Sequence, residues 1–198
     1  MEGLRSARVA LLAGLFLCCL PGTRALALDQ EERDAAYKRA DAGLKRALAR
    51  ASKDEIAYWV EQLGAVGTPR AIERVLAVGE RFPGEPVRTS ALQALVWSKS
   101  DTCLEFYDGE LKRTRDPERA ILIIEALERI KNPLSVTPLI AALQARDTRV
   151  LLSALRALRQ KPSPEAVEGC IAFFKKVEET RDLLWAETRI TLLALTGE

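Results

Sequence analysis

Few residues of this chain could do chemistry. Histidine is absent, which excludes a Ser-His-Asp triad, a His-activated cysteine and His-bearing zinc sites. Carboxylate pairs such as Glu31 with Glu32 and Glu178 with Glu179 lie in charge-dense helical segments, where they are typical of solvated faces and i,i+4 ion pairs. Two carboxylates could hydrolyse a glycoside, yet nothing brings a chosen pair together in a cleft. We therefore expect no catalytic residues, no cofactor and no metal.

Cys103 and Cys170 are the cysteines that follow the N-terminal segment considered below. In the repeat described below, Cys103 shares a column of small residues with Ala71, Ser135 and Ala166. A column of small residues predicts a buried structural thiol. Cys170 lies two repeats further on, roughly 20 Å away if neighbouring helices are about 8 to 10 Å apart. That separation is too large for a disulfide, so we expect no redox pair.

Exposed aromatic rings are frequent hot spots of protein interfaces, so the tryptophans are candidates for a binding surface. Trp59, Trp97 and Trp185 fall in or at the end of the second helix of their repeats. These second helices are expected to line the concave side of the array. Because tryptophan is also a common core residue, a packing role stays open. We take Trp59 and Trp97 as candidate protein-binding residues.

A column of polar positions accompanies these tryptophans. Gln93, Glu125, Arg156 and Leu193 each come directly before the anchor alanine of a repeat, and helical spacing should point them away from the seam between helices. The mixed charge of the column suits a protein surface better than a phosphate or a membrane. We take the first three as further candidate protein-binding residues.

A repeat of about 32 residues positions all these side chains. An anchor dipeptide recurs at spacings of 32, 32, 31 and 37 residues: Gln62-Leu63, Ala94-Leu95, Ala126-Leu127, Ala157-Leu158 and Ala194-Leu195. Ten residues before the first four anchors stand possible helix caps, namely Ser52, Gly84, Asp116 and Asp147. Five residues after each of the first four leucines the chain restarts with a second set of caps, three of them followed by proline: Thr68, Ser100, Asn132 and Ser163.

These start signals predict five pairs of helices, and no run of alternating β-branched residues supports a strand. The expected pairs are 29–51 with 54–66, 69–81 with 86–98, 102–113 with 117–131, 134–145 with 148–160, and 165–178 with 182–195. One pair cannot bury its own apolar faces, so stability must come from stacking, and the terminal units must differ from the rest.

The segment from Pro86 to Leu95 resembles the second helix of a HEAT repeat of the PBS-lyase HEAT-like variant, in which Val-Arg-x-x-Ala-x-x-Ala-Leu precedes a turn. The segment from Asp147 to Leu158 fits with the Val-Arg order reversed, whereas the third copy has Arg119 and Ile123 where Val and Ala are usual. The resemblance implies an all-α class, an α/α solenoid of about five pairs, which in this family is mostly a protein-binding scaffold. Some relatives are bilin lyases, DNA glycosylases or metal-dependent hydroxylases. The His-Glu ligands of the hydroxylases are missing from this chain.

The N-terminus has the pattern of a cleavable signal peptide. Arg5 and Arg8 precede an uncharged apolar run from Val9 to Leu20, and Ala25-Leu26-Ala27 offers a cleavage site. At 1.5 Å per residue the run reaches only about 18 Å, short of the ~30 Å hydrocarbon core. We expect residues 1–27 to be removed and residues 28–198 to form one exported domain, periplasmic or secreted, with no membrane span.

Cleavage would leave a formally neutral chain, because the removed segment carries three arginines and one glutamate of a chain whose net charge is +2. A nucleic-acid binder needs a basic stripe to neutralise phosphates, so no nucleic-acid partner is expected. The expected partner is another protein.

The C-terminus stops at Thr196-Gly197-Glu198, directly after an apolar run. A solenoid usually closes with a polar outer face, and here the seam meant for the next repeat is left open. Either the last unit folds back over it, or the face docks on a partner or on a second copy as a homodimer. We expect Leu184, Trp185, Thr188 and Leu192 near such a contact.

The sequence therefore favours a non-enzymatic protein-binding scaffold or adaptor of the cell envelope or extracellular space. A HEAT-type lyase or maturation factor acting on an exported substrate is the alternative. The identity of the partner, the binding face and the oligomeric state stay open.

Overall fold

The structure is a computed structural model that describes residues 29–177 and 182–197. Within these residues the secondary structure is ten α-helices and one 3-10 helix, without strands. The helices are α2 (Gln30–Arg50), α3 (Lys53–Val66), α4 (Pro69–Arg81), α5 (Val87–Trp97), α6 (Asp101–Arg113), α7 (Pro117–Arg129), η1 (Pro133–Ser135), α8 (Val136–Ala142), α9 (Thr148–Arg159), α10 (Pro164–Phe174) and α11 (Asp182–Thr196). The expected all-helical class is confirmed. The predicted signal peptide, residues 1–27, lies outside the described residues.

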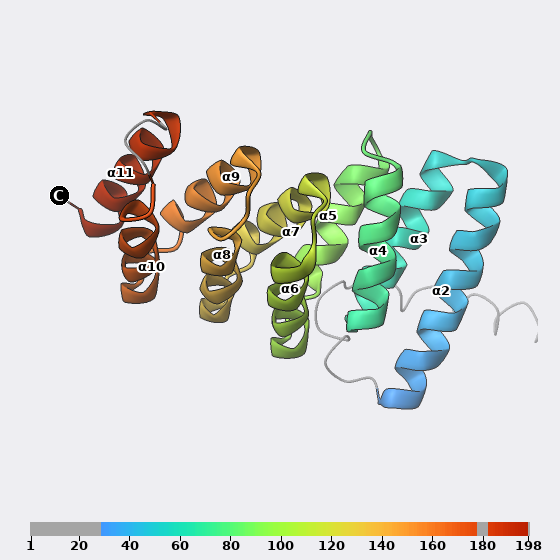
Figure 1. Cartoon of the computed structure of the whole chain (residues 1–198). Coiled ribbons are helices and arrows are strands. Elements are labelled where there is room, and N and C mark those ends of the chain that lie inside the picture. The colour runs from blue at the N-terminus through green and yellow to red at the C-terminus, as the bar shows by residue number, and fades with distance from the viewer. Residues whose placement is uncertain (1–28, 178–181, 198) are drawn as a thin grey trace, which may run out of the picture.

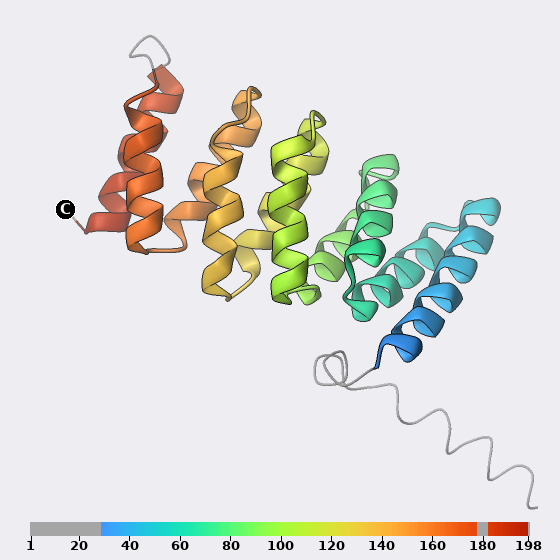
Figure 2. The ribbon, with the colours of Figure 1, turned by 60° about the horizontal axis from the view of Figure 1, so that its bottom comes forward.

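The helices alternate between two layers (Figures 1 and 2). The second helices of the pairs, α3, α5, α7, α9 and α11, each contact the next one along the row, and α6, α8 and α10 do the same in the other layer. Successive pairs therefore lie side by side from α2 and α3 at one end to α10 and α11 at the other. Each pair contacts chiefly its neighbours in sequence.

Polar side chains begin most of the helices at the expected places. Thr68 and Ser163 accept hydrogen bonds from the amides three residues ahead, and Asp116 and Asp147 accept them at the starts of α7 and α9. These bonds satisfy amides that have no partner within the helix. Ser52 caps α3 in the same way.

Two expected caps are wrong. The helix α5 begins at Val87 after Pro86, so Gly84 lies in the preceding turn and offers only its carbonyl oxygen, to the amide of Arg88. The hydroxyl of Ser100 stands at the cap position of α6 but donates to the Cys103 sulfur at 3.0 Å.

The first helix of the fourth pair is shorter than expected. In place of one helix over 134–145, the chain forms the 3-10 turn η1 and then the seven residues of α8. Pro138 explains this, because a proline lacks an N–H and is tolerated only in the first turn of a helix. The α-helix therefore begins at Val136, two residues before the proline, so that Pro138 lies in its first turn.

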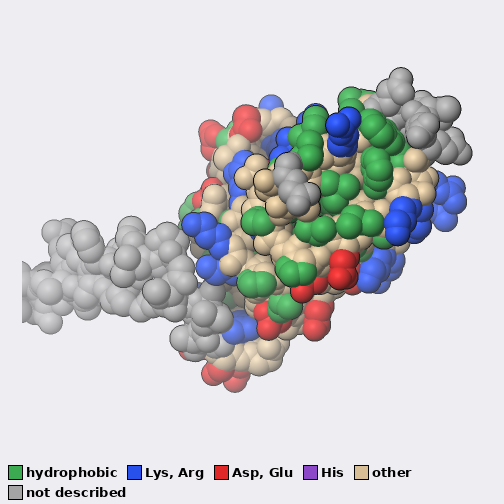
Figure 3. Space-filling model, turned by 90° about the vertical axis from the view of Figure 1, so that its left-hand side faces the viewer, with side chains coloured by type: hydrophobic (Ala, Val, Ile, Leu, Met, Phe, Trp, Pro, Cys, Tyr) green, Lys and Arg blue, Asp and Glu red, His purple; other side chains and the backbone are tan. Residues whose placement is uncertain are grey.

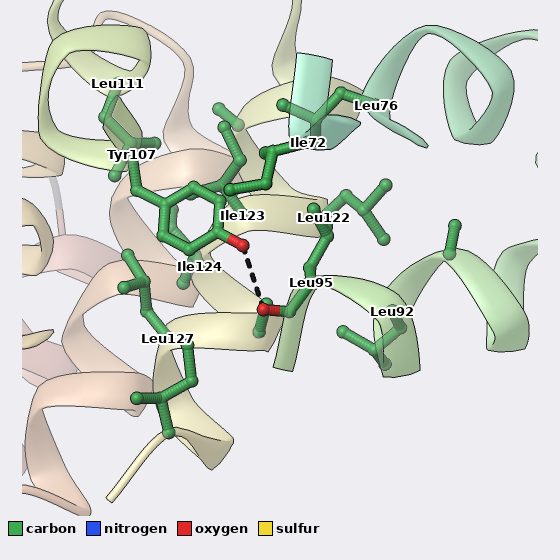
Figure 4. Packing of buried hydrophobic residues seen from close by; sticks show 14 of the residues in the cluster. Ile72, Leu76, Leu92, Leu95, Tyr107, Leu111, Leu122, Ile123, Ile124 and Leu127 are labelled. Carbon is green, nitrogen blue, oxygen red and sulfur yellow. Dashed lines mark hydrogen bonds between the residues drawn. The ribbon is translucent and has the colours of Figure 1, made fainter. Parts of the chain in front are cut away.

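The core lies between the layers and forms one cluster along the row. Figure 4 shows the part of it around Tyr107. The anchor leucines Leu63, Leu95, Leu127 and Leu158 are fully buried. Close approach is possible where small residues meet: a Cβ added to Gly64 of α3 would lie 2.4 Å from the Cβ of Ala94 of α5. The contact between α3 and α5 therefore depends on the absence of a side chain at position 64.

The last pair departs from the expected register. Ala194 is exposed and Leu195 is only half-buried, so they do not occupy the anchor position. Three other residues of α11 are buried with the same spacing as Val150, Ala154 and Ala157 of α9: Leu184, Thr188 and Thr191. The last anchor is therefore Thr191-Leu192, and the repeat spacing before it is 34 residues.

Candidate protein-binding surfaces

Trp59 packs between the first two helices. Its indole lies directly over Gly43 of α2, where an added Cβ would be 2.3 Å from the ring atom Cε2. The neighbouring ring of Tyr58 meets it edge to face, with 5.0 Å between ring centres. Trp59 is half-buried and Tyr58 is 54% exposed. The ring that a partner could reach at this end is therefore mainly that of Tyr58.

Trp97 lies at the last position of α5 and is 37% exposed, whereas Gln93, one turn earlier, is half-buried. The structure leaves Trp97 accessible at the C-terminal end of α5, whereas the indole of Trp59 packs against α2.

The charged residues of the second helices join neighbouring pairs. The guanidinium of Arg88 donates to both carboxylate oxygens of Glu125 at 2.9 and 3.0 Å, and these hydrogen bonds raise the pKa of Arg88. Arg156 lies 3.5 Å from Glu187, which Arg159 also contacts. Glu125 is thus engaged across the seam α5–α7, which limits what it offers to a partner, whereas the side chain of Arg156 is 64% exposed and stays accessible.

Arg119, the residue that replaces valine in the third copy of the repeat, lies between two carboxylates. It donates to Glu80 of α4 at 2.6 Å and to Glu110 of α6 at 2.5 and 2.8 Å. Burial lowers the pKa of Arg119, but these hydrogen bonds outweigh it and the pKa is raised. The departure from the repeat pattern is therefore compensated by an ion-paired cluster that links three helices.

A groove of about 810 Å³ lies between the turn joining α6 to α7 and the turn joining α8 to α9. Its apolar lining includes Leu111, Ala120 and Val150, which are buried, and Ala141 and Ala145, which are partly exposed. The groove is formed by two consecutive helix pairs, so neither pair contains it alone.

Basic side chains surround this groove. Arg115 and Arg146 occupy the same place in consecutive units, each directly before the aspartate that caps a second helix. Both are exposed, and among the described residues neither has an ion pair. The carboxylates of Asp116 and Asp147 accept hydrogen bonds from the backbone amides of Glu118 and Arg149. One oxygen of each carboxylate is therefore already engaged at the start of a helix. The sequence analysis missed this site; its signal was the repeated Arg-Asp dipeptide.

At the C-terminal end, two of the four expected contact residues are buried. Leu184 is 2% exposed and Thr188 is 0% exposed, and the Thr188 hydroxyl donates to the carbonyl oxygen of Leu184 at 2.6 Å. The expectation that they contact a partner is therefore wrong, since both face the core. Trp185, stacked on Phe174 with 5.5 Å between ring centres, and Leu192 are half-buried.

Large apolar side chains are nevertheless exposed on the last two helices: Ile171 (41%), Leu183 (60%), Ile190 (47%) and Leu193 (46%). Figure 3 looks onto this end of the molecule and shows hydrophobic side chains gathered near its centre with charged ones at the edge. An apolar surface of this kind is typical of an interface.

The two thiols behave as expected for core residues. Cys103 and Cys170 are both free and buried. Burial raises the pKa of the Cys170 thiol to about 11 and also raises that of Cys103. A thiol with a raised pKa is a poor nucleophile near neutral pH. In the part of the chain that the structure describes, no group of three or more His, Cys, Asp or Glu side chains could hold a metal ion.

Comparisons of the chain with protein-family models, with curated proteins and with solved structures find no match. Over the described residues, no helix is long and apolar enough to cross a membrane.

Proposed function

We propose that this chain is a non-enzymatic protein-binding module, exported after loss of residues 1–27 and built as a HEAT-type solenoid of five helix pairs. The row of stacked pairs and the buried anchor columns support the architecture. The sequence pattern of the first 27 residues supports export. Repeat arrays of this kind present extended surfaces to their partners.

The observation that carries the proposal is the groove between the α6–α7 and α8–α9 turns. It combines an apolar lining with the unpaired guanidinium groups of Arg115 and Arg146 at its edge. Apolar burial supplies affinity, while guanidinium groups pair well with carboxylates. The complementary occupant is an extended polypeptide segment that carries acidic side chains beside apolar ones.

A polypeptide fits this groove better than a small molecule. Small-molecule sites enclose most of the ligand surface, whereas much of this lining is itself exposed, including Arg113, Gln144 and Arg146. A groove open along its length suits an extended chain that continues beyond it on both sides.

The experiment is affinity capture from the native envelope or secreted fraction, with the retained proteins quantified by mass spectrometry. We compare the wild type with Arg115→Glu/Arg146→Glu, which reverses the charge of the groove. The matched control is Arg39→Glu/Arg46→Glu, which makes the same change at exposed positions of α2. Circular dichroism verifies that all three proteins fold.

We expect the wild type and the control to retain the same partner in stoichiometric amount, and the groove variant to lose it at least tenfold. Equal retention by all three proteins would show that the groove is not the binding site. Turnover of a substrate by the purified chain, without any stoichiometric partner, would favour the alternative of a HEAT-type lyase or maturation factor.

A further inference from the structure

We propose that two copies of this chain associate end to end through α10 and α11, with α10 of each copy antiparallel to α10 of the other. The proposed contact lies on the side of the last helix pair that faces away from α8 and α9. It does not depend on the groove or on its occupant.

The last pair exposes large apolar side chains, Ile171 on α10 and Leu183, Ile190 and Leu193 on α11. In α9, Leu151 and Leu155 are buried. The hydroxyl of Thr191, in α11, donates to the carbonyl oxygen of Leu155. At the equivalent positions of α11, 34 residues later, Trp185 is half-buried and Arg189 is exposed. The column of Leu151 is therefore only partly covered at Trp185, and the column of Leu155 carries the charged Arg189. The apolar area left to be buried is that of Trp185 and of the exposed isoleucine and leucine side chains.

The charges along α10 are arranged to match a second copy of the same helix. Glu168 stands three residues before the exposed Ile171, and Lys175 stands four residues after it. Helical geometry places all three on one side of α10, with the two charges about 4.5 and 6 Å along the axis from Ile171. This face of α10 therefore has an apolar residue at its centre, with an acidic residue toward the N-terminus and a basic residue toward the C-terminus at nearly equal distances from it.

A twofold axis next to Ile171 makes this arrangement self-complementary. An antiparallel copy of α10 places Ile171 against Ile171 of the partner subunit, and Glu168 against the partner's Lys175. The same contact is made a second time by symmetry, as an isologous interface requires. Glu168 and Lys175 are both exposed, and among the described residues neither has an ion pair.

The size of the face sets the expected affinity. Two helices about 10 Å apart and about 16 Å long bury a surface area at or below the small end of the range for specific protein interfaces. We therefore expect a dissociation constant in the micromolar range for the whole exported protein.

Sedimentation velocity from about 1 to 100 µM tests the dimer with variants of exposed residues, whose fold is checked by circular dichroism. Ile171→Glu should be monomeric. Glu168→Lys and Lys175→Glu should each weaken self-association at least tenfold, because each places like charges opposite one another. The groove variant Arg115→Glu/Arg146→Glu should dimerise like the wild type, so that failure of the dimer and failure of the groove are distinguishable.

The decisive arm is a mixture of the two single charge variants. In a heterodimer of Glu168→Lys with Lys175→Glu, both charge pairs again join opposite charges, so the mixture should dimerise at least tenfold more tightly than either variant alone. A wild type that is monomeric at 100 µM overturns the proposal. Charge variants that dimerise like the wild type, or a mixture that stays monomeric, overturn the antiparallel α10 contact.

Discussion

Individual polar side chains link each helix pair to the preceding one by binding carbonyl oxygens of its second helix, mostly near the C-terminal end. The Ser98 hydroxyl donates to Gly64 at 3.2 Å, the Tyr107 hydroxyl to Leu95 at 2.8 Å, and the Lys161 ammonium to Ile130 at 2.6 Å. The last carbonyl groups of a helix have no partner within it. The carbonyl oxygens of Gly64 and Leu95 also accept hydrogen bonds from backbone amides, and that of Ile130 accepts one from Ser135. The side chains therefore add a second hydrogen bond to each oxygen, and they fix one pair against the next.

The buried Cys170 thiol makes stability depend on pH under alkaline conditions. Its pKa is raised to about 11 by burial, against about 8.5 in an unfolded chain. Between these values the unfolded chain has released a proton that the folded chain still holds, so the free energy of unfolding falls as the pH rises. Below about pH 8 both states hold the proton and this contribution is constant.

We expect the wild type to lose about 1.4 kcal/mol more per pH unit than Cys170→Ala between about pH 9 and pH 11. Urea unfolding with a reductant present, repeated at several pH values, measures the difference. Cys103 and Tyr107 also have raised pKa values, but they are common to both proteins and cancel. Parallel pH profiles would show that Cys170 does not titrate between the two states.

At the level of helices, the sequence predicted most elements to within two residues because their start signals are local. Thr68-Pro69 and Ser163-Pro164 each mark a helix start through a side-chain acceptor and a residue that needs no donor. Pro138 was overlooked as a limit on α8, although its effect is equally local. The register of α11 could not be read, since the segment before it is longer than in other pairs and the Ala-Leu dipeptide occurs three residues too late.

The surfaces were harder to predict than the helices. Whether Leu184 or Leu183 faces solvent depends on how α11 rotates about its axis against α9 and α10, because consecutive residues of a helix point about 100° apart. The groove is formed by turns 31 residues apart in the sequence, between Arg115 and Arg146. Its existence depends on the angle between two pairs, which no local pattern contains.

Glycine at a helix crossing gives a prediction for a single element. An added methyl group at Gly64 would lie 2.4 Å from the Ala94 Cβ and 2.5 Å from its Cα, so Gly64→Ala must push α3 and α5 apart. We expect a loss of about 1 to 3 kcal/mol in the free energy of unfolding. Chemical denaturation of the purified variant measures it.

Gly109→Ala is the matched control. This glycine also lies within a helix, α6, but an added Cβ would meet only the Arg113 guanidinium at 3.7 Å. Alanine favours helix by about 1 kcal/mol over glycine, so the control should be neutral or more stable than the wild type. If both variants lose the same stability, close packing at Gly64 is not what limits the substitution.

For the molecule as a whole, the row of pairs predicts unequal costs for truncating a leucine in the central pair and one in the last pair. Leu127 is fully buried in the central pair, whereas Leu195 is half-buried in the last one. Leu127→Ala should cost about 2 to 5 kcal/mol because helices on both sides prevent collapse into the cavity, and Leu195→Ala should cost about 1 kcal/mol or less. Urea unfolding compares the two, and equal losses would contradict a linear arrangement.

Processing of the whole chain is tested separately. Mass spectrometry of exported protein should find an N-terminus at or near Leu28, directly before Asp29, which caps α2. Cleavage there leaves the first described helix complete. Membrane-bound protein that keeps residues 1–27 would contradict the predicted signal peptide.

The cluster at Arg119 has a mechanical consequence. Because it joins α4 of the second pair to α6 and α7 of the third, and Arg88 with Glu125 spans the same junction, these two pairs resist bending as one stiff block. The next junction, α7–α9, is crossed by the exposed pair of Arg149 with Glu118, whose side chains are 60% and 57% exposed. Water and salt weaken such a pair, so the two junctions should respond differently to ionic strength: added salt weakens the link between Arg149 and Glu118 before it weakens the more shielded cluster at Arg119.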